Sequence, residues 1–283
     1  MGTTEVRRVR IGHSPDPDDA FMYYAIAAGK VDTGGYAVVQ VLEDIESLNR
    51  RALAGELEVT AISIHAYAHL ADRYALMGCG ASMGDGYGPI VVARETLASG
   101  ELARKTIAIP GTLTSAFLAL RLYLGDAFPF VVVPFDEILD VVAAGGADAG
   151  LIIHEGQLTY ATQGLVKVVD LGAWWSERTG GLPLPLGGNA VRRDLGSDAM
   201  RALTKMYRDS ISFGLENRAE ALAYAKGFGR GLDDRLNDRF VGMYVNDLTL
   251  DYGERGRRSI QRFLDEGTAA GIVPPVGPVT FVS

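Results

Sequence analysis

Apolar and polar positions follow two regimes along the chain. From residue 6 to about residue 171, short apolar runs alternate with stretches of helical periodicity, a pattern typical of βαβ units and a largely parallel sheet. The predicted strands cover residues 6–12, 37–42, 58–63, 74–79, 90–94, 105–109, 130–133, 149–153 and 166–170. The predicted helices between them cover residues 18–29, 44–54, 65–71, 113–123 and 136–144.

The second regime begins after Asp194 and is mostly helical. Ser197 is expected to cap a long helix that runs to about Glu216, and Gly271 is expected to follow the end of the last helix. Serine is a preferred residue at the beginning of a helix, and glycine is preferred just after its end.

Two stretches rich in glycine and proline, residues 84–95 and 180–192, flank the middle α/β block. They are expected to be extended linkers, because residues before proline are disfavoured in the α region. A chain that crosses to a second lobe and returns needs two such crossings. The sequence therefore predicts two α/β lobes with a ligand cleft between them. Residues 1–92 and 190–283 are expected to form the larger lobe, and residues 93–189 the smaller one.

Composition narrows the class of protein. The 283 residues are 48% hydrophobic and 22% charged, and no apolar run approaches the roughly 20 residues of a membrane span. The net charge of -8 argues against a nucleic-acid partner, since such binding relies on clustered basic residues. Cys79 is the single cysteine, and the first residues lack the apolar core of a secretory signal. A cytoplasmic protein with no membrane partner is expected.

Several familiar motifs are matched only in part, because residues or elements that they require are missing. Residues 80–84 match a nucleophile elbow, but Asp-Gly-Tyr-Gly-Pro follows where a helix is needed. The glycine-rich stretch 78–89 contains no complete G-x-G-x-x-G dinucleotide motif. The acids of residues 16–19 lack the glycine and the final glutamate of a calcium loop. The sequence therefore specifies no metal site and no nucleotide cofactor.

Polar residues remain at four places where a predicted strand gives way to a helix. Such strand ends form the ligand crevice of open α/β sheets. They are the stretch His13-Ser-Pro-Asp-Pro-Asp-Asp19, the strand end Ser63-Ile-His65, the turn Pro110-Gly-Thr-Leu-Thr-Ser115 and the strand end His154-Glu155.

The first and third of these places differ in the ligand group that they suit. The turn of residues 110–115 offers hydroxyls and free helix N–H groups to a carboxylate, although Thr112 could simply cap the helix. The three acids of residues 13–19 make a poor seat for a carboxylate. The hydroxyl-bearing end of a ligand is therefore expected there.

A histidine at the end of a buried strand is a candidate general base, because its ordinary pKa lies near neutrality. His154 is the preferred candidate, with a purely structural role as the alternative. His13 and His65 are competitors, and His69 is expected at the surface. Trp174 and its neighbour could stack on a planar ligand, although packing in the core is the simpler interpretation.

Taken in order, several motifs resemble the MqnD family, which supplies 1,4-dihydroxy-6-naphthoate synthase in the futalosine route to menaquinone. The likeness covers nearly the whole chain, and motifs in matching order are more specific than any one alone. The motifs are Ser14-Pro-x-Pro-x-Asp19, Leu42-Glu-Asp-x-Glu-x-Leu-Asn49, Pro110-Gly-x-x-Thr114, Gly150-Leu-Ile-Ile-His154-Glu155, Gly181-Leu-Pro-Leu-Pro-Leu-Gly187 and Tyr244-Val-Asn246.

The resemblance implies a periplasmic-binding-protein type II fold that works as a cytoplasmic carbon–carbon lyase without a cofactor. The implied substrate is cyclic de-hypoxanthine futalosine, an aromatic carboxylate. By position, His154 corresponds to the proton-abstracting base. The resemblance places the substrate against Ala61, Ile62 and Ser63 on one side of the cleft and Thr114 and Ser115 on the other, with Asp19 and Asn49 in support.

Four residues depart from the pattern of that family, namely His13, Asp16, Asp18 and His65. Either the polar end of the substrate differs, or the proton-transfer role is shared or moved to another residue. Two further functions stay open, a solute-binding protein without catalysis and the sister chorismate dehydratase. The His-Glu strand end and the Ser-Pro-x-Pro motif favour the naphthoate branch over the dehydratase.

Overall fold

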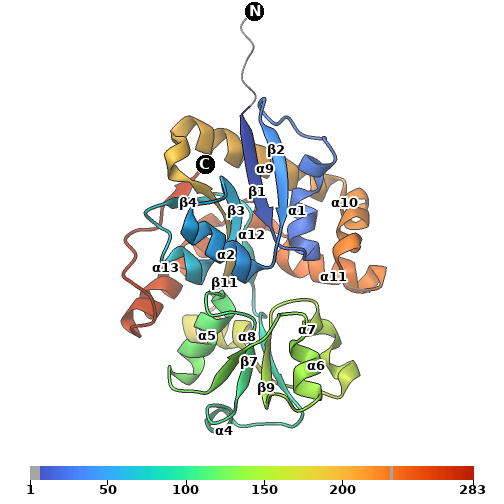
Figure 1. The fold of residues 1–283 in the computed structure, drawn as a ribbon, viewed down its shortest axis with the longest axis vertical. Helices are drawn as coiled ribbons and strands as arrows, with labels where there is room; N and C mark the ends of the chain where they lie inside the picture. The colour runs from blue at the N-terminus through green and yellow to red at the C-terminus, as the bar shows by residue number, and fades with distance from the viewer. Residues whose placement is uncertain (1–6, 230–231) are drawn as a thin grey trace, which may run out of the picture.

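The computed structural model describes residues 7–229 and 232–283 and shows two lobes, each built on its own sheet (Figure 1). The larger sheet has the strand order β12-β4-β11-β3-β1-β2, with β5 paired to β11. The smaller sheet has the order β10-β6-β9-β7-β8. The predicted α/β class with two lobes is confirmed.

The larger lobe combines the two ends of the chain. Its strands are β1 (Arg8–His13), β2 (Ala37–Leu42), β3 (Val59–Ser63), β4 (Tyr74–Met77), β5 (Ser82–Gly84), β11 (Leu184–Arg192) and β12 (Phe281–Val282). Its helices are α1 (Pro17–Ala27), α2 (Ile45–Ala54), α3 (Ile64–Tyr67), α9 (Ser197–Glu216), α10 (Arg218–Ala225), α11 (Asp234–Tyr244), α12 (Asp247–Leu250) and α13 (Gly253–Ala269).

The smaller lobe is formed by the middle of the chain. Its strands are β6 (Ile90–Ala93), β7 (Ile107–Ile109), β8 (Phe130–Val132), β9 (Ala149–Ile152) and β10 (Val166–Asp170). Its helices are α4 (Ser99–Leu102), α5 (Ser115–Leu124), α6 (Ile138–Ala143), α7 (Gly156–Thr159) and α8 (Leu171–Thr179). Along the described ranges, no helix is both long and apolar enough to cross a bilayer.

One hydrophobic core continues from the larger lobe into the smaller. Ile62 and Phe263 of the larger lobe belong to the same buried cluster as Leu118 and Trp175 of the smaller one. Trp175 is fully buried and donates its indole N–H to Ser259 Oγ at 3.2 Å. This tryptophan therefore packs in the core, which ties α8 to α13. Each such buried side chain stabilises the fold by about 1.5–3 kcal/mol.

The stretch 180–192 is more ordered than the sequence predicted. Residues Leu184–Arg192 form β11, which pairs antiparallel with β3 and β4 in the middle of the larger sheet. The glycines allow close packing there, since a Cβ at Gly188 would lie 2.6 Å from the hydroxyl oxygen of Tyr252. The expectation of a linker was wrong over these nine residues, because the strand is stabilised by neighbours distant in sequence.

The expectation of a largely parallel sheet also needs correction. In the smaller sheet β6 runs antiparallel to β9 and β10, while β7 runs parallel to β8 and β9. The antiparallel strands β6 and β11 are those that follow the two crossings between the sheets. The lobe division into residues 1–92 with 190–283 and 93–189 stays a prediction.

Two predicted helix caps lie elsewhere. Gly196, with φ of 83°, precedes α9, and Ser197 is already its first helical residue. Thr114, not Thr112, caps α5 by accepting a hydrogen bond from the N–H of Phe117 at 3.2 Å.

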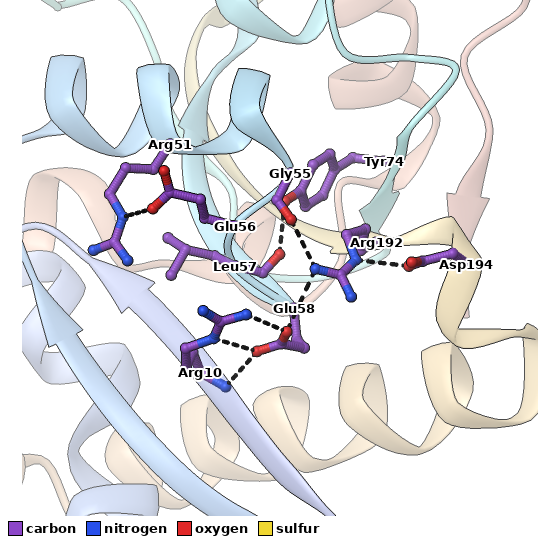
Figure 2. Close-up of polar contacts among 9 residues, drawn as sticks. All are labelled: Arg10, Arg51, Gly55, Glu56, Leu57, Glu58, Tyr74, Arg192 and Asp194. Carbon is purple, nitrogen blue, oxygen red and sulfur yellow. Dashed lines mark hydrogen bonds and ion pairs between the residues drawn. The ribbon is translucent and has the colours of Figure 1, made fainter.

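Charged side chains join three strands of the larger sheet at the strand ends that lie away from the smaller lobe (Figure 1), and Figure 2 shows their contacts. The carboxylate of Glu58 accepts hydrogen bonds from Arg10 Nε at 2.9 Å and from a terminal guanidinium nitrogen at 2.7 Å. Arg192, at the end of β11, lies 3.4 Å from the same carboxylate and also pairs with Asp194. These contacts join the beginnings of β1 and β3 to the end of β11.

Candidate active site

A cavity of about 100 Å³ lies between the lobes, where β1 and β3 end and helices begin. Both lobes contribute to its lining. The larger lobe supplies residues of the turn after β1, of β3, β5 and β11, and of α11, and the smaller lobe supplies the beginning of α5 and the end of β9. This is the crevice position typical of open α/β sheets.

Six of the eight residues singled out from the sequence line this cavity: Asp19, Ala61, Ile62, Ser63, Thr114 and Ser115. The other two lie beside it. Asn49 is fully buried behind Ser63, and His154 directly follows the lining residue Ile153. The fold therefore brings the polar ends of three separate strands to the cavity, with the fourth strand end, at His154, next to it in the chain.

The position of Ser63 is fixed by Asn49 of α2. The Asn49 side chain accepts a hydrogen bond from Ser63 N at 2.9 Å and donates one to Ser63 Oγ at 3.0 Å. Asn49 itself has no exposed surface. The amide thus holds both polar groups of Ser63 at the cavity wall.

The beginning of α5 forms the facing wall. The first N–H groups of a helix have no partner inside it, and here Ser115 and Ala116 border the cavity. Ser115 Oγ donates to the carbonyl of Leu186 and accepts from the N–H of His65 at 3.1 Å. These bonds hold the helix end against the larger lobe. A helix N-terminus of this kind favours an anionic group.

The turn after β1 forms an acidic wall. Asp16, Asp18 and Asp19 line the cavity with Ser14, whose N–H donates to the Asp19 carboxylate at 2.9 Å. Burial raises the pKa of Asp19 to about 6, although the Ser14 hydrogen bonds act in the opposite direction. Burial, followed by the charges of Asp19 and Asp16, raises the pKa of Asp18 well above its ordinary value. This wall can hold a proton at near-neutral pH.

His13 is held as a neutral ring with both nitrogens engaged. Its Nδ1 lies 2.8 Å from the carbonyl oxygen of Ser14 and therefore donates, and its Nε2 accepts from the amide nitrogen of Gln40 at 2.8 Å. Burial lowers the pKa of His13 to about 4. A ring without a free lone pair is a poor general base, so His13 is a weak competitor for that role.

His65 is also held as a neutral ring, and it joins the lobes. Its Nδ1 donates to the carbonyl oxygen of Thr114 at 3.1 Å, and burial lowers the pKa of His65 to about 4. His69 is exposed, as expected. His13 and His65, which depart from the family pattern, thus each form a hydrogen bond with a residue that lines the cavity.

His154 differs from His13 because one of its ring nitrogens lacks a hydrogen-bond partner. Its Nδ1 accepts a hydrogen bond from the N–H of Gly156 at 3.0 Å, so a neutral ring carries its proton on Nε2. Among the described residues nothing bonds to Nε2, although His154 is only 5% exposed. The Glu155 carboxylate lies 3.7 Å from Nδ1. A buried orphan nitrogen of this kind is unusual and marks a candidate functional group.

Sequence reasoning missed part of the cavity. Phe240 and Tyr244 of α11 also line it, as do Ser82 and Asn189 of the larger sheet. Tyr244 was noted only within a motif, and no local pattern marks Phe240 or Asn189. Their place at the cavity follows from the return of the C-terminal helices to the cleft, which no spacing in the sequence predicts.

Comparison with known proteins gives the family. A sequence profile described as "Menaquinone biosynthesis" matches residues 9–269. The chain belongs to this menaquinone biosynthesis family. Two curated relatives carry the name 1,4-dihydroxy-6-naphtoate synthase. The one from Thermus thermophilus is 45% identical over 97% of this chain and 99% of its own. The one from Streptomyces coelicolor is 38% identical over 95% of this chain and 96% of its own.

Solved structures give the fold. A crystal structure of a protein from Archaeoglobus fulgidus superimposes with a TM-score of 0.90 at 48% identity, over 94% of this chain and 98% of that chain. The alkanesulfonate-binding protein SsuA from Xanthomonas axonopodis superimposes with a TM-score of 0.73 at 14% identity, over 98% of both chains. The expected periplasmic-binding-protein fold of this family member is confirmed.

Proposed function

We propose that this protein is a 1,4-dihydroxy-6-naphthoate synthase, a carbon–carbon lyase of menaquinone biosynthesis. The observation that carries the proposal is the 45% identity with the Thermus enzyme of that name over almost the whole of both chains. The cavity between the lobes supports it with a site of suitable chemistry. The substrate implied by the family resemblance is cyclic de-hypoxanthine futalosine.

Charge decides how such a substrate lies in the cavity. Among the described residues that line it there is no lysine or arginine, so a carboxylate has to rely on N–H and hydroxyl donors. The backbone N–H groups at the beginning of α5 supply such donors, because the hydroxyls of Thr114 and Ser115 already donate to the carbonyl oxygens of Gly111 and Leu186. The acidic turn at Asp18 and Asp19 disfavours further negative charge, as the raised pKa values of its carboxyls show, but its oxygens accept hydrogen bonds from hydroxyl groups. We therefore place the carboxylate of the substrate at α5 and its hydroxyl-bearing end at the aspartates.

The proposed chemistry begins with removal of a proton next to a carbonyl group, with His154 as the base. Cleavage of a carbon–carbon bond follows and releases the sugar-derived carbons as the second product, and formation of the aromatic naphthoate provides the driving force. No redox change requires a cofactor in this sequence of steps. An imidazole is a common general base, and a cavity closed between lobes excludes water.

His154 can accept this proton at Nε2 only if its own proton moves to Nδ1. Nδ1 then has to exchange the Gly156 N–H for an acceptor, and the carboxylate of Glu155, 3.7 Å away, is in place to become one. A carboxylate behind the imidazole would also stabilise the cation that forms. The pair His154 and Glu155 is therefore assigned as base and orienting group.

The experiment that tests the function follows naphthoate formation from the cyclic substrate by fluorescence, with thermal unfolding measured beside it. An enzyme forms product in proportion to its concentration, whereas a solute-binding protein shows only a rise in Tm with ligand. Chorismate serves as the second substrate, because its dehydration would identify the sister activity. We expect turnover of the cyclic substrate alone. The cytoplasmic location expected from the sequence remains part of this proposal.

A further inference from the structure

A hydrogen bond spans the cleft at the end of α11. Tyr244, the last residue of this helix, lines the cavity and is 2% exposed. Its hydroxyl lies 2.9 Å from the amide oxygen of Gln157. Gln157 belongs to α7 in the smaller lobe, at 8% exposure. The bond therefore joins the two lobes at the cavity.

The segment that Tyr244 contacts is also the segment that holds His154. Gly156, the first residue of α7, donates its N–H to His154 Nδ1, and Gln157 donates its N–H to the His154 carbonyl oxygen, each at 3.0 Å. The ring also packs closely on this turn, since a Cβ at Gly156 would lie 2.6 Å from His154 Cε1. The backbone bond and the ring packing do not depend on the partner of Nδ1, so a movement of Gln157 moves the imidazole.

We propose that Tyr244 and Gln157 are positioning residues, and that the bond between them sets the place of α7, and with it of His154, when the lobes close. The inference rests on the proposed synthase function. The bond forms only when α11 and α7 meet, because its two partners belong to different lobes. It thereby couples closure of the cavity to the position of the proposed base.

A second observation favours a role in positioning over a role in stability. The Gln157 amide nitrogen is buried and has no hydrogen-bond partner among the described residues. An orphan donor of this kind costs stability, and an apolar side chain would avoid that cost. Only the end of Gln157 that meets Tyr244 is paired. The contact with Tyr244 is thus the feature that an apolar residue could not replace.

The hydroxyl of Tyr244 can be removed without removing its packing. The ring stands edge-on to Phe240 at 5.3 Å between centroids and to Tyr87 at 6.0 Å. Tyr87 is itself held by a hydrogen bond from its hydroxyl to the carbonyl of Met243. Tyr244→Phe therefore keeps the ring in place and deletes one bond.

The test compares Tyr244→Phe, Gln157→Leu and the double variant on the cyclic substrate. Each single variant is expected to lower kcat by about tenfold and to change KM by less than about threefold, since the lost bond acts on the base. The double variant is expected to lose no more kcat than the more impaired of the two single variants, because both substitutions remove the same hydrogen bond. Tyr74→Phe is the matched control. Tyr74 is fully buried and donates to the Leu57 carbonyl oxygen at 2.6 Å, away from the cavity.

Three results would overturn the inference while leaving the synthase function intact. They are full kcat in Tyr244→Phe, losses that add in the double variant, and an equal loss of kcat in Tyr74→Phe. An inactive wild-type protein would contradict the function instead.

Hydrogen exchange tests the positioning role of Tyr244 and Gln157 without a measurement of turnover. Tyr244→Phe should speed amide exchange in α7 (Gly156–Thr159), and unchanged exchange there would contradict the positioning role.

Discussion

Asn49 and Ser63 are joined by two hydrogen bonds, with the Asn49 amide accepting from Ser63 N at 2.9 Å and donating to Ser63 Oγ at 3.0 Å. Asn49→Ala removes both bonds and leaves the Ser63 N–H buried without a partner. We expect the free energy of unfolding to fall by about 1–3 kcal/mol. We also expect KM for the cyclic substrate to rise severalfold, because Ser63 loses its fixed orientation at the cavity wall.

The control for this prediction is Asn217→Ala. Asn217 donates to the Phe213 carbonyl oxygen at 3.0 Å at the end of α9, and it is not part of the cavity. This variant should lose stability without a change in KM. An unchanged KM in Asn49→Ala would show that the amide supports the fold but not the site.

Asp19→Asn is expected to stabilise the protein while lowering its activity. Burial raises the pKa of Asp19 from 3.8 to about 6, so the folded protein resists ionisation of this group and loses stability as pH rises from about 4 through 6. Asparagine carries no charge, and its side-chain oxygen can still accept from Ser14 N. Urea unfolding should show Asp19→Asn more stable by about 2 kcal/mol at pH 8 and similar to wild type near pH 4. Lower stability of the variant at pH 8 would contradict this placement.

The buried histidines give a spectroscopic prediction. Burial lowers the pKa of both His13 and His65 from 6.5 to about 4. A lowered histidine pKa adds stability that is fully present above pH 6.5 and is lost as pH falls from there toward 4. Imidazole NMR signals of these two rings should stay constant between pH 8 and pH 5.5. Titration of His13 near pH 6.5 would show that its ring is solvated.

The ion pairs of Glu58 at the strand ends of the larger sheet predict an effect on stability without an effect on catalysis (Figure 2). Burial acts to raise the pKa of Glu58, but the hydrogen bonds and charge of Arg10 outweigh it and lower that pKa below 4.5. Glu58→Gln should therefore lower the unfolding free energy by about 1–3 kcal/mol at pH 7. The difference should vanish as pH falls below 4.5.

Asp194→Ala is the matched change for Glu58→Gln, because it removes an exposed partner of Arg192. Its effect should stay below about 1 kcal/mol. Both variants should keep the kcat of the wild type. Equal losses of stability from the two substitutions would mean that burial of Glu58 adds nothing to its ion pairs.

The parts of the fold with local signals were predictable from the sequence. The alternation of apolar runs and helical stretches identified β1 to β4 and placed polar residues such as Ser63 and Thr114 at strand ends, where the structure shows them lining one cavity. The rule that strand ends meet at one edge of a sheet is sufficient for this step. The same rule indicated the stretch of residues 13–19, and the family resemblance selected Asp19 within it.

The remainder depends on contacts between distant segments. The β11 strand carries the glycine and proline content of a linker, and only its pairing with β3 and β4 makes it a strand. Tyr244 and Gln157 are 87 positions apart and meet because the C-terminal helices return to the cleft. Neither relationship leaves a periodic pattern in the sequence.

The central claim is that this cavity performs chemistry on the cyclic substrate. The most direct measurement incubates the purified wild-type protein and His154→Ala with cyclic de-hypoxanthine futalosine and identifies the products by mass spectrometry. We predict that the wild type forms one 1,4-dihydroxy-6-naphthoate per substrate consumed, and that His154→Ala binds the substrate but returns it unchanged. Recovery of unaltered substrate from the wild-type protein would contradict the account.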